Sequence, residues 1–163
     1  QAPAAGSQPG LSTLVLFEPQ VSPALEGNAL LYRLAYADAQ QLKPYALTRW
    51  VMSPAQLISQ RLRQQLAGQR AVVAPGEVSA QLSLRLVLEE FSQVFDSPVD
   101  SHGLLRLRAT LTKRNGSSET LLAQRSFVVQ QPAPTPDAVG AVRALTVASD
   151  QAVTQLTAWL AAL

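Results

Sequence analysis

The strongest constraint on the fold is a period-two alternation of apolar residues in two stretches of the chain. The alternating positions are Leu82, Leu84, Leu86, Leu88, Leu105, Leu107, Ala109 and Leu111. Successive side chains of a strand point to opposite faces, so this pattern predicts strands with one buried and one solvated face. Asn115-Gly116 precedes a third apolar run at 121–129, and Asn-Gly between alternating runs is a strong hairpin signal. We therefore expect an antiparallel meander.

A first helix is expected ahead of this meander. Ser53, Pro54 and Gln56 fit a capping box with proline at the first helical position. The apolar stripe that follows at helical spacing is Leu57, Ile58, Leu62 and Leu66. Gly68 marks its end.

A second, longer helix is expected to close the chain. Thr135 serves as its predicted N-cap, with Pro136 at the first position and Asp137 near the positive end of the helix dipole. The predicted apolar face consists of Val139, Val142, Leu145, Ala152, Leu156, Trp159, Leu160 and Leu163. Gly140 interrupts the first turns, which a close contact between helix and sheet would explain.

The order of elements predicts an α+β fold, a single domain in which two main helices pack on a mostly antiparallel sheet. Three short strands are expected before the first helix, at 14–17, 29–35 and 47–52. The first ten residues are small and rich in proline and glycine, as in a flexible tether. We therefore assign residues 1–11 to a flexible N-terminal tether and 12–163 to one domain.

Composition and motifs argue against an enzyme. The chain of 163 residues has no cysteine, few charges and a net charge of +2, without the basic clusters of nucleic-acid binders. The only histidine, His102, lies in a turn-rich stretch beside Asp100 and Ser101, and triad members must instead converge from separate elements. No pattern for a metal or a phosphate-binding loop occurs. We expect no catalytic residues, metal or cofactor and no nucleic-acid partner.

The segment from Pro44 to Pro54 is the first candidate binding region. The two prolines restrict the backbone around them. Tyr45 and Trp50 combine apolar area with a polar group, and Arg49 can pair with an acid or a phosphate. The alternative is that Trp50 belongs to the core beneath the following helix.

A second candidate is the sheet face opposite the leucine rows, which should carry Arg85, Arg106 and Arg108. It is interpreted either as a basic patch for anionic lipid headgroups or an acidic partner, or as an ordinary solvated face. Glu89 and Glu90 are adjacent, and one of them is expected to form a structural cross-strand pair near Arg106 or Arg108.

Two stretches resemble a known family. They are residues 42–54, followed by Leu57 and Arg61-Leu62, and residues 88–95 (Leu-Glu-Glu-Phe-Ser-Gln-Val-Phe). Together with 142–145 and Trp159-Leu160, they are similar to the ABC-type transport auxiliary lipoproteins over about Leu14 to Leu163. That family includes the paraquat-inducible outer-membrane lipoproteins of Gram-negative bacteria.

The resemblance implies a non-catalytic periplasmic protein, anchored to the outer membrane by a lipidated N-terminal cysteine that this chain lacks. It implies an MCE-domain protein with its ABC permease and ATPase as partners, and phospholipid as cargo. The alternative is an envelope lipoprotein that scaffolds or regulates cell-wall or outer-membrane assembly without handling lipid. A homo-oligomer is a further expectation, because sheet edges invite pairing.

Overall fold

The computed structural model describes residues 12–77 and 80–163, so the predicted tether at 1–11 lies outside the described residues. Within them the chain forms one sheet and two α-helices. The elements in chain order are β1 (Leu14–Leu16), β2 (Gln20–Val21), a 3-10 turn (Pro23–Leu25), β3 (Ala29–Leu34), β4 (Asp38–Arg49), α1 (Pro54–Leu66), β5 (Val72–Val73), β6 (Leu82–Phe95), β7 (Ser101–Asn115), β8 (Ser118–Pro132) and α2 (Ala138–Ala161).

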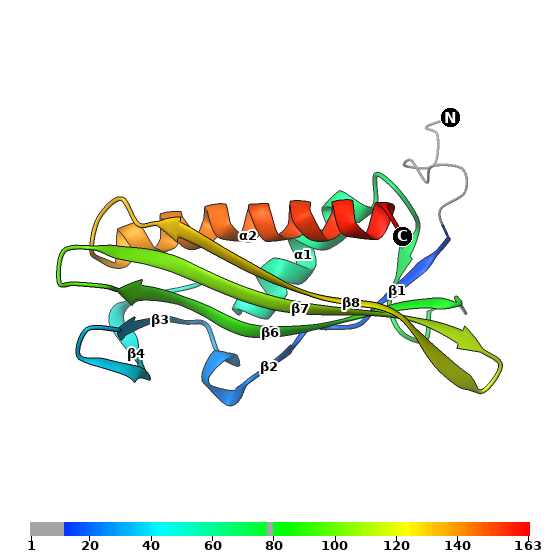
Figure 1. Ribbon diagram of the computed structural model, residues 1–163, viewed down its shortest axis with the longest axis horizontal. Coiled ribbons are helices and arrows are strands. Elements are labelled where there is room, and N and C mark those ends of the chain that lie inside the picture. Colours follow the sequence, from blue (N-terminus) through cyan, green and yellow to red (C-terminus); the bar gives the residue numbers. More distant parts are fainter. Residues whose placement is uncertain (1–11, 78–79) are drawn as a thin grey trace.

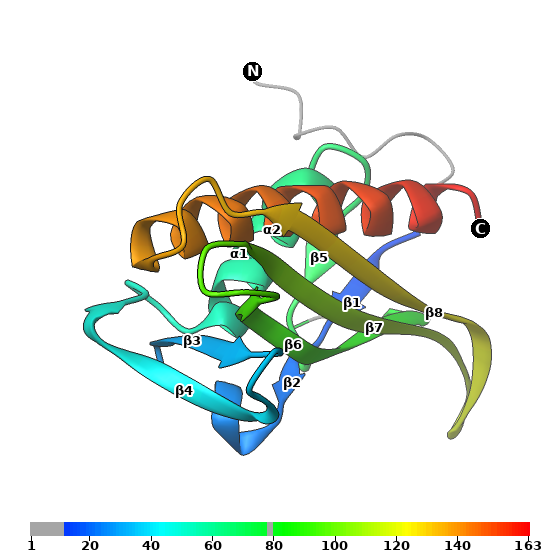
Figure 2. The ribbon, with the colours of Figure 1, turned by 60° about the vertical axis from the view of Figure 1, so that its left-hand side comes forward.

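The sheet is built around β6, and its long pairings are antiparallel. β6, β7 and β8 form the predicted meander, and β3 pairs antiparallel with β4. Four shorter pairings are parallel: β6 with β1, β2 and β3, and β1 with β5. Figures 1 and 2 show α1 and α2 on the same side of this sheet. The predicted α+β fold class is therefore confirmed.

The leucine alternation places the core between the sheet and the helices. Leu84, Leu86 and Leu88 are buried, and the predicted row on β7 is buried beside them. The apolar side of α2 covers these rows with Leu145, Leu156 and Leu160. The opposite face of the same strands carries the polar residues of the alternation, as a half-buried antiparallel sheet requires.

The predicted hairpin and the first helix are confirmed. β7 ends at Asn115 and β8 begins at Ser118, and Gly116 takes a φ of +66°, which the side chain of most other residues would oppose. Ser53 Oγ accepts from the backbone N–H of Gln56, and Gln56 Oε1 accepts from that of Ser53, each at 3.3 Å. This reciprocal capping fixes where α1 begins.

Two strand predictions hold and one is wrong. The expected strands at 14–17 and 29–35 correspond to β1 and β3. The expected strand at 47–52 is instead β4, which runs from Asp38 to Arg49 and stops before Trp50. Most of β4 is polar and exposed because the strand lies at an edge of the sheet, so its sequence does not alternate. β8 occupies another edge, and self-association through either edge stays a prediction.

The start of α2 also differs from the prediction. Its N-cap is Asp137, not Thr135, and the carboxylate accepts from the backbone N–H of Gly140 at 2.9 Å. Thr135 Oγ1 donates to the same carboxylate at 2.6 Å, and these bonds hold the pKa of Asp137 below its usual range. Val139 and Leu163, predicted on the apolar face, are each 60% exposed, because the buried face instead uses the small residues Ala141, Ala144 and Ala148.

Gly140 is required by a contact that differs from the predicted one. A Cβ atom at this position would lie 1.9 Å from the backbone oxygen of Thr135, in the loop before α2 and not in the sheet. Replacing Gly140 by Ala is expected to cost about 1–3 kcal/mol of unfolding free energy, despite the better helix propensity of alanine. Urea denaturation measures this cost. Gly68→Ala is the control, since its nearest neighbour would be at 3.6 Å, and equal stability of the two variants would contradict the assignment.

Candidate functional site

The segment 44–54, here called the β4–α1 segment, is held to the domain by Tyr45. The Tyr45 hydroxyl donates to Oε1 of Gln93, a fully buried residue of β6. The Gln93 amide donates in turn to Ser101 Oγ at 2.9 Å and to the backbone oxygen of Asp137 at 3.1 Å. Tyr45 also packs on Tyr32, with the ring centroids 4.7 Å apart. The hydroxyl therefore connects β4 to β6, β7 and the start of α2.

Burial is the main cause that raises the pKa of Tyr45 to about 12, with smaller contributions from Tyr32 and Asp137. The folded state thus keeps this proton more tightly than the unfolded chain, whose tyrosines titrate near about 10. The resulting stability is complete below pH 10 and is lost as the pH rises through about 12.

Replacing Tyr45 by Phe tests both roles of the hydroxyl. The Gln93 carbonyl oxygen would lose its donor in a buried site, which is expected to cost about 1–3 kcal/mol of unfolding free energy near neutral pH. The loss of stability between pH 10 and 12 should also become shallower than in the wild type. Urea denaturation across this pH range measures both effects. An unchanged stability at both ends would show that the hydroxyl is solvated.

Trp50 holds the other end of the β4–α1 segment. Its ring packs on Phe91 with centroids 5.4 Å apart, and its backbone N–H donates to the oxygen of Asn28 at 2.8 Å. The indole Nε1 is buried and has no acceptor among the residues that the structure describes. Of the two alternatives left open by the sequence, these contacts favour packing against the core.

Between these two anchors the segment presents apolar side chains to solvent. Leu47 is 98% exposed and Val51 is 96% exposed, and the side chain of Arg49 lies between them in sequence, also exposed. In residues 12–77 and 80–163, Arg49 forms no ion pair. Two aliphatic side chains and one cation therefore protrude from a fixed backbone.

An irregular stretch of β4 explains this protrusion. In the β3–β4 pairing, Leu31 lies opposite Pro44 and Ala29 opposite Arg49, so β4 carries extra residues that bulge out of the ladder. A regular alternation from Tyr45 would instead have placed Leu47 on the buried side. The sequence predicts Tyr45, Arg49 and Trp50 as candidate binding residues but not Leu47 and Val51, because no local pattern marks the bulge.

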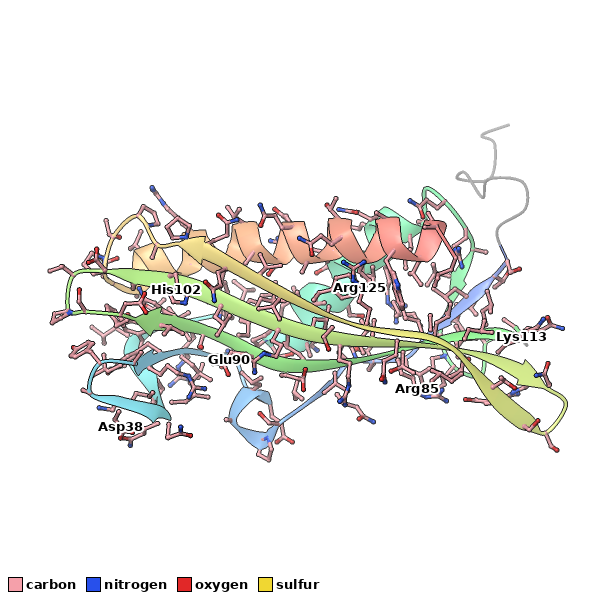
Figure 3. All side chains as sticks on the ribbon, in the orientation of Figure 1. Asp38, Arg85, Glu90, His102, Lys113 and Arg125 are labelled. Carbon is pink, nitrogen blue, oxygen red and sulfur yellow. The ribbon has the colours of Figure 1, made fainter. Side chains whose placement is uncertain are left out.

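The three arginines of the second candidate share one face, as expected. Arg85 lies opposite Thr110 in register, on the face that also carries Arg106 and Arg108. Figure 3 shows Arg85 and Arg125 on opposite sides of the sheet, in agreement with the pairing of Arg125 with Ala109. Arg106 and Arg108 are exposed and form no ion pair with the part of the chain that the structure describes.

Arg85 differs from Arg106 and Arg108 because its guanidinium group contacts both Phe17 and Glu119. Its guanidinium lies 4.3 Å from the centroid of the Phe17 ring, and it donates to both carboxylate oxygens of Glu119, at 2.9 and 3.3 Å. These hydrogen bonds hold the pKa of Glu119 below its usual range. Arg85 therefore links β6 to the turn end of the β7–β8 hairpin and borders the sheet face that carries Arg106 and Arg108.

Glu90 and His102 have structural partners. Glu90 lies opposite Arg106 in register, but its ion pair is with Arg33 of β3, at 2.9 Å, and not with Arg106 or Arg108. His102 is not in an exposed turn: it lies in β7, and its Nδ1 is 3.0 Å from a carboxylate oxygen of Asp96. In the β6–β7 pairing His102 lies opposite Val94, four positions along β6 from Glu90. In the described ranges, neither helix is long and apolar enough to cross a membrane.

Comparison with known proteins gives a family match and a shared fold. The sequence model of the family described as ABC-type transport auxiliary lipoprotein component matches residues 1–157. No curated protein matches the chain in sequence.

Among solved structures, the protein XCC0632 from Xanthomonas campestris is similar over 95% of this chain and 89% of its own, with a TM-score of 0.80 and 17% identity. A second, uncharacterized protein is similar over 91% and 92%, with a TM-score of 0.71 and 17% identity. A hypothetical protein from Chlamydia trachomatis is similar over 94% and 100%, with a TM-score of 0.53 and 11% identity. At these identities the likeness extends to the fold alone.

Proposed function

Because this chain belongs to the family of ABC-type transport auxiliary lipoproteins, we propose that it is the non-catalytic periplasmic component of a lipid transport system formed by an MCE-domain protein and an ABC permease with its ATPase. Family membership indicates an envelope-associated, secreted lipoprotein with an auxiliary role. The proposal adds phospholipid as cargo, the MCE protein as partner and an outer-membrane anchor of the paraquat-inducible type.

The observation that carries the proposal is the protruding group Leu47, Arg49 and Val51 on the β4–α1 segment. Two almost fully exposed aliphatic side chains on one anchored segment suit a protein contact, because little loop ordering would be needed on binding. The chain has no acidic residue between Asp38 and Glu77, so a partner surface with apolar and acidic groups would complement it.

The position of this segment also suits such a contact. Its anchors Tyr45 and Trp50 contact Gln93 and Phe91 near the end of β6, whereas β1 pairs with the beginning of that strand. The two places are about 30 Å apart along the strand. Figure 1 shows β4 and β1 toward opposite ends of the sheet. With an N-terminal lipid anchor, the segment would lie at the far end of the domain, where a component that spans the envelope can reach it.

Affinity purification from envelopes solubilised in mild detergent tests the proposal. The tagged full-length lipoprotein is expected to retain an MCE-domain protein and its ABC permease. Recovery of cell-wall or outer-membrane assembly factors in their place, under conditions that preserve the transport complex, would favour the scaffold alternative and contradict the proposal.

A further inference from the structure

A cavity of about 460 Å³ opens on the sheet face that the helices leave uncovered, where β1 and β2 join β6. Its apolar walls come from Phe17, Pro75 and Val87, and Thr110 and Arg85 form its polar side. The volume lies within the range of about 300–1,000 Å³ that is usual for small-molecule sites. An apolar hollow with one polar side suits a ligand that is itself amphipathic.

The cavity is continuous with the cationic part of the sheet face. Val87 of the cavity wall lies directly opposite Arg108 in the β6–β7 pairing, and Arg106 follows two positions along the same face. Side chains at such positions are about 5–8 Å apart. The guanidinium groups of Arg106 and Arg108, which have no ion-pair partner among the described residues, therefore lie beside the apolar opening and can reach a group held at its mouth.

Three carboxylates near the cavity already have partners, and one of them, Glu90, lies opposite Arg106 in register and is paired with Arg33. Glu18 borders the cavity and forms an ion pair with Arg63 at 3.3 Å. Glu119 is held by Arg85. Arg85 itself is fixed on the Phe17 ring, so it shapes the wall of the cavity. Arg106 and Arg108, which form no ion pair within residues 12–77 and 80–163, supply the positive charge that a headgroup would meet.

We propose that this site binds one anionic amphiphile, with an acyl chain in the cavity between Phe17, Pro75 and Val87 and a carboxylate or phosphate headgroup on Arg106 and Arg108. The inference rests on the proposed role in lipid transport for its biological setting, and it names where this chain contacts the cargo. The site lies apart from the β4–α1 segment, which leaves cargo binding and partner binding separable.

Fluorescence titration of the purified chain with dansyl-undecanoic acid tests the site. Saturable binding is expected, because the probe has both an acyl chain and a carboxylate. Dodecanoate and lysophosphatidylglycerol serve as competitors for the two sources of the ligand, a free fatty acid and a phospholipid. Dodecanol, which lacks the charge, should displace the probe at least about tenfold less well, which corresponds to the loss of one charged contact. Equal displacement by dodecanol would overturn the assignment of the headgroup.

Variants on the two faces of the sheet distinguish specific binding at the cavity from general electrostatic attraction between the anionic probe and the arginines. Val87→Asp places a charge in the apolar wall, and Arg106→Gln with Arg108→Gln removes the headgroup contacts; each should weaken binding about tenfold or more. Arg125→Gln removes an exposed arginine of the same sheet on its other face and should stay within about twofold. Circular dichroism confirms folding, and the double arginine variant, which is exposed at both positions, keeps the test valid if Val87→Asp unfolds.

The titrations test the proposed site with the purified chain alone and need no partner protein. An absence of saturable binding, or an equal loss in Arg125→Gln and in the double arginine variant, would overturn the site. Such a result would leave the proposed docking to an MCE protein standing, because that docking is measured by affinity purification. Conversely, saturable binding of the probe, combined with an affinity purification that recovers no envelope partner, would support the site and contradict the proposed transport complex.

Discussion

Replacing Glu90 by Ala is expected to lower the free energy of unfolding by about 3–5 kcal/mol, because it leaves a buried guanidinium without its counterion. The side chains of Glu90 and Arg33 are only 11% and 19% exposed. Arg33 donates to both carboxylate oxygens of Glu90, at distances between 2.9 and 3.1 Å, and Ser92 Oγ donates to one of them at 2.5 Å. All of these donors would lose their acceptor at once.

The size of this effect depends on burial, and a matched variant can show it. Asp150→Ala removes the carboxylate of another arginine pair, with Arg61, in which the side chains are 30% and 64% exposed. That change is expected to cost no more than about 1 kcal/mol. Chemical denaturation of the two variants at neutral pH measures the difference. A similar, small loss in both would mean that water replaces the carboxylate of Glu90.

A double variant tests whether stability depends on the ion pair itself or on the volume that its two side chains fill. Arg33→Met combined with Glu90→Leu fills a similar volume without a buried charge. It should be more stable than Glu90→Ala, because replacement of both partners removes the desolvated cation. A double variant less stable than Glu90→Ala would show that the hydrogen bonds of Arg33, including that to the Ala39 oxygen, hold β3 and β4 in place.

The ion pair between Glu90 and Arg33 could not be predicted from the sequence. Alternation identified β6 and β7 as strands and their leucines as core, because the side-chain period is a local property of the backbone. The partner of Glu90 depends on which strand lies on the other side of β6, and that strand is β3, reached through a parallel pairing. A bulge between Leu88 and Glu90 shifts the register as well. Neither the parallel neighbour nor the bulge has a local signature.

The same limit applies to the β4–α1 segment. The capping box at Ser53 and the hairpin at Asn115-Gly116 could be predicted, because each requires particular residues at fixed spacing. The exposure of Leu47 could not, because it follows from extra residues in β4 that the β3 ladder does not pair. The sequence marks Tyr45 and Trp50 as candidate binding residues. In the structure these aromatic residues anchor the segment, and the aliphatic residues Leu47 and Val51 protrude.

Those protruding residues give the largest functional effect that we expect. The double variant Leu47→Asp and Val51→Asp should weaken retention of the MCE-domain partner by about a hundredfold or more, since two central apolar contacts of about 1–2 kcal/mol each would become desolvated charges. Folding should be unaffected, because both side chains are almost completely exposed in the isolated chain. Quantitative affinity purification of the partner, with wild type and variant at equal expression, measures the effect.

The control for that experiment lies at another exposed apolar position of the same chain. Val99 is 72% exposed in the loop between β6 and β7, and we predict no partner contact there. Val99→Asp replaces an exposed aliphatic side chain by a carboxylate, as the changes at Leu47 and Val51 do. Partner retention should then match the wild type. Equal retention by the Leu47/Val51 double variant and the wild type would exclude the protruding group as the docking surface. Equal loss in Val99→Asp would instead show that added negative charge alone disrupts the complex, because the partner surface is itself acidic.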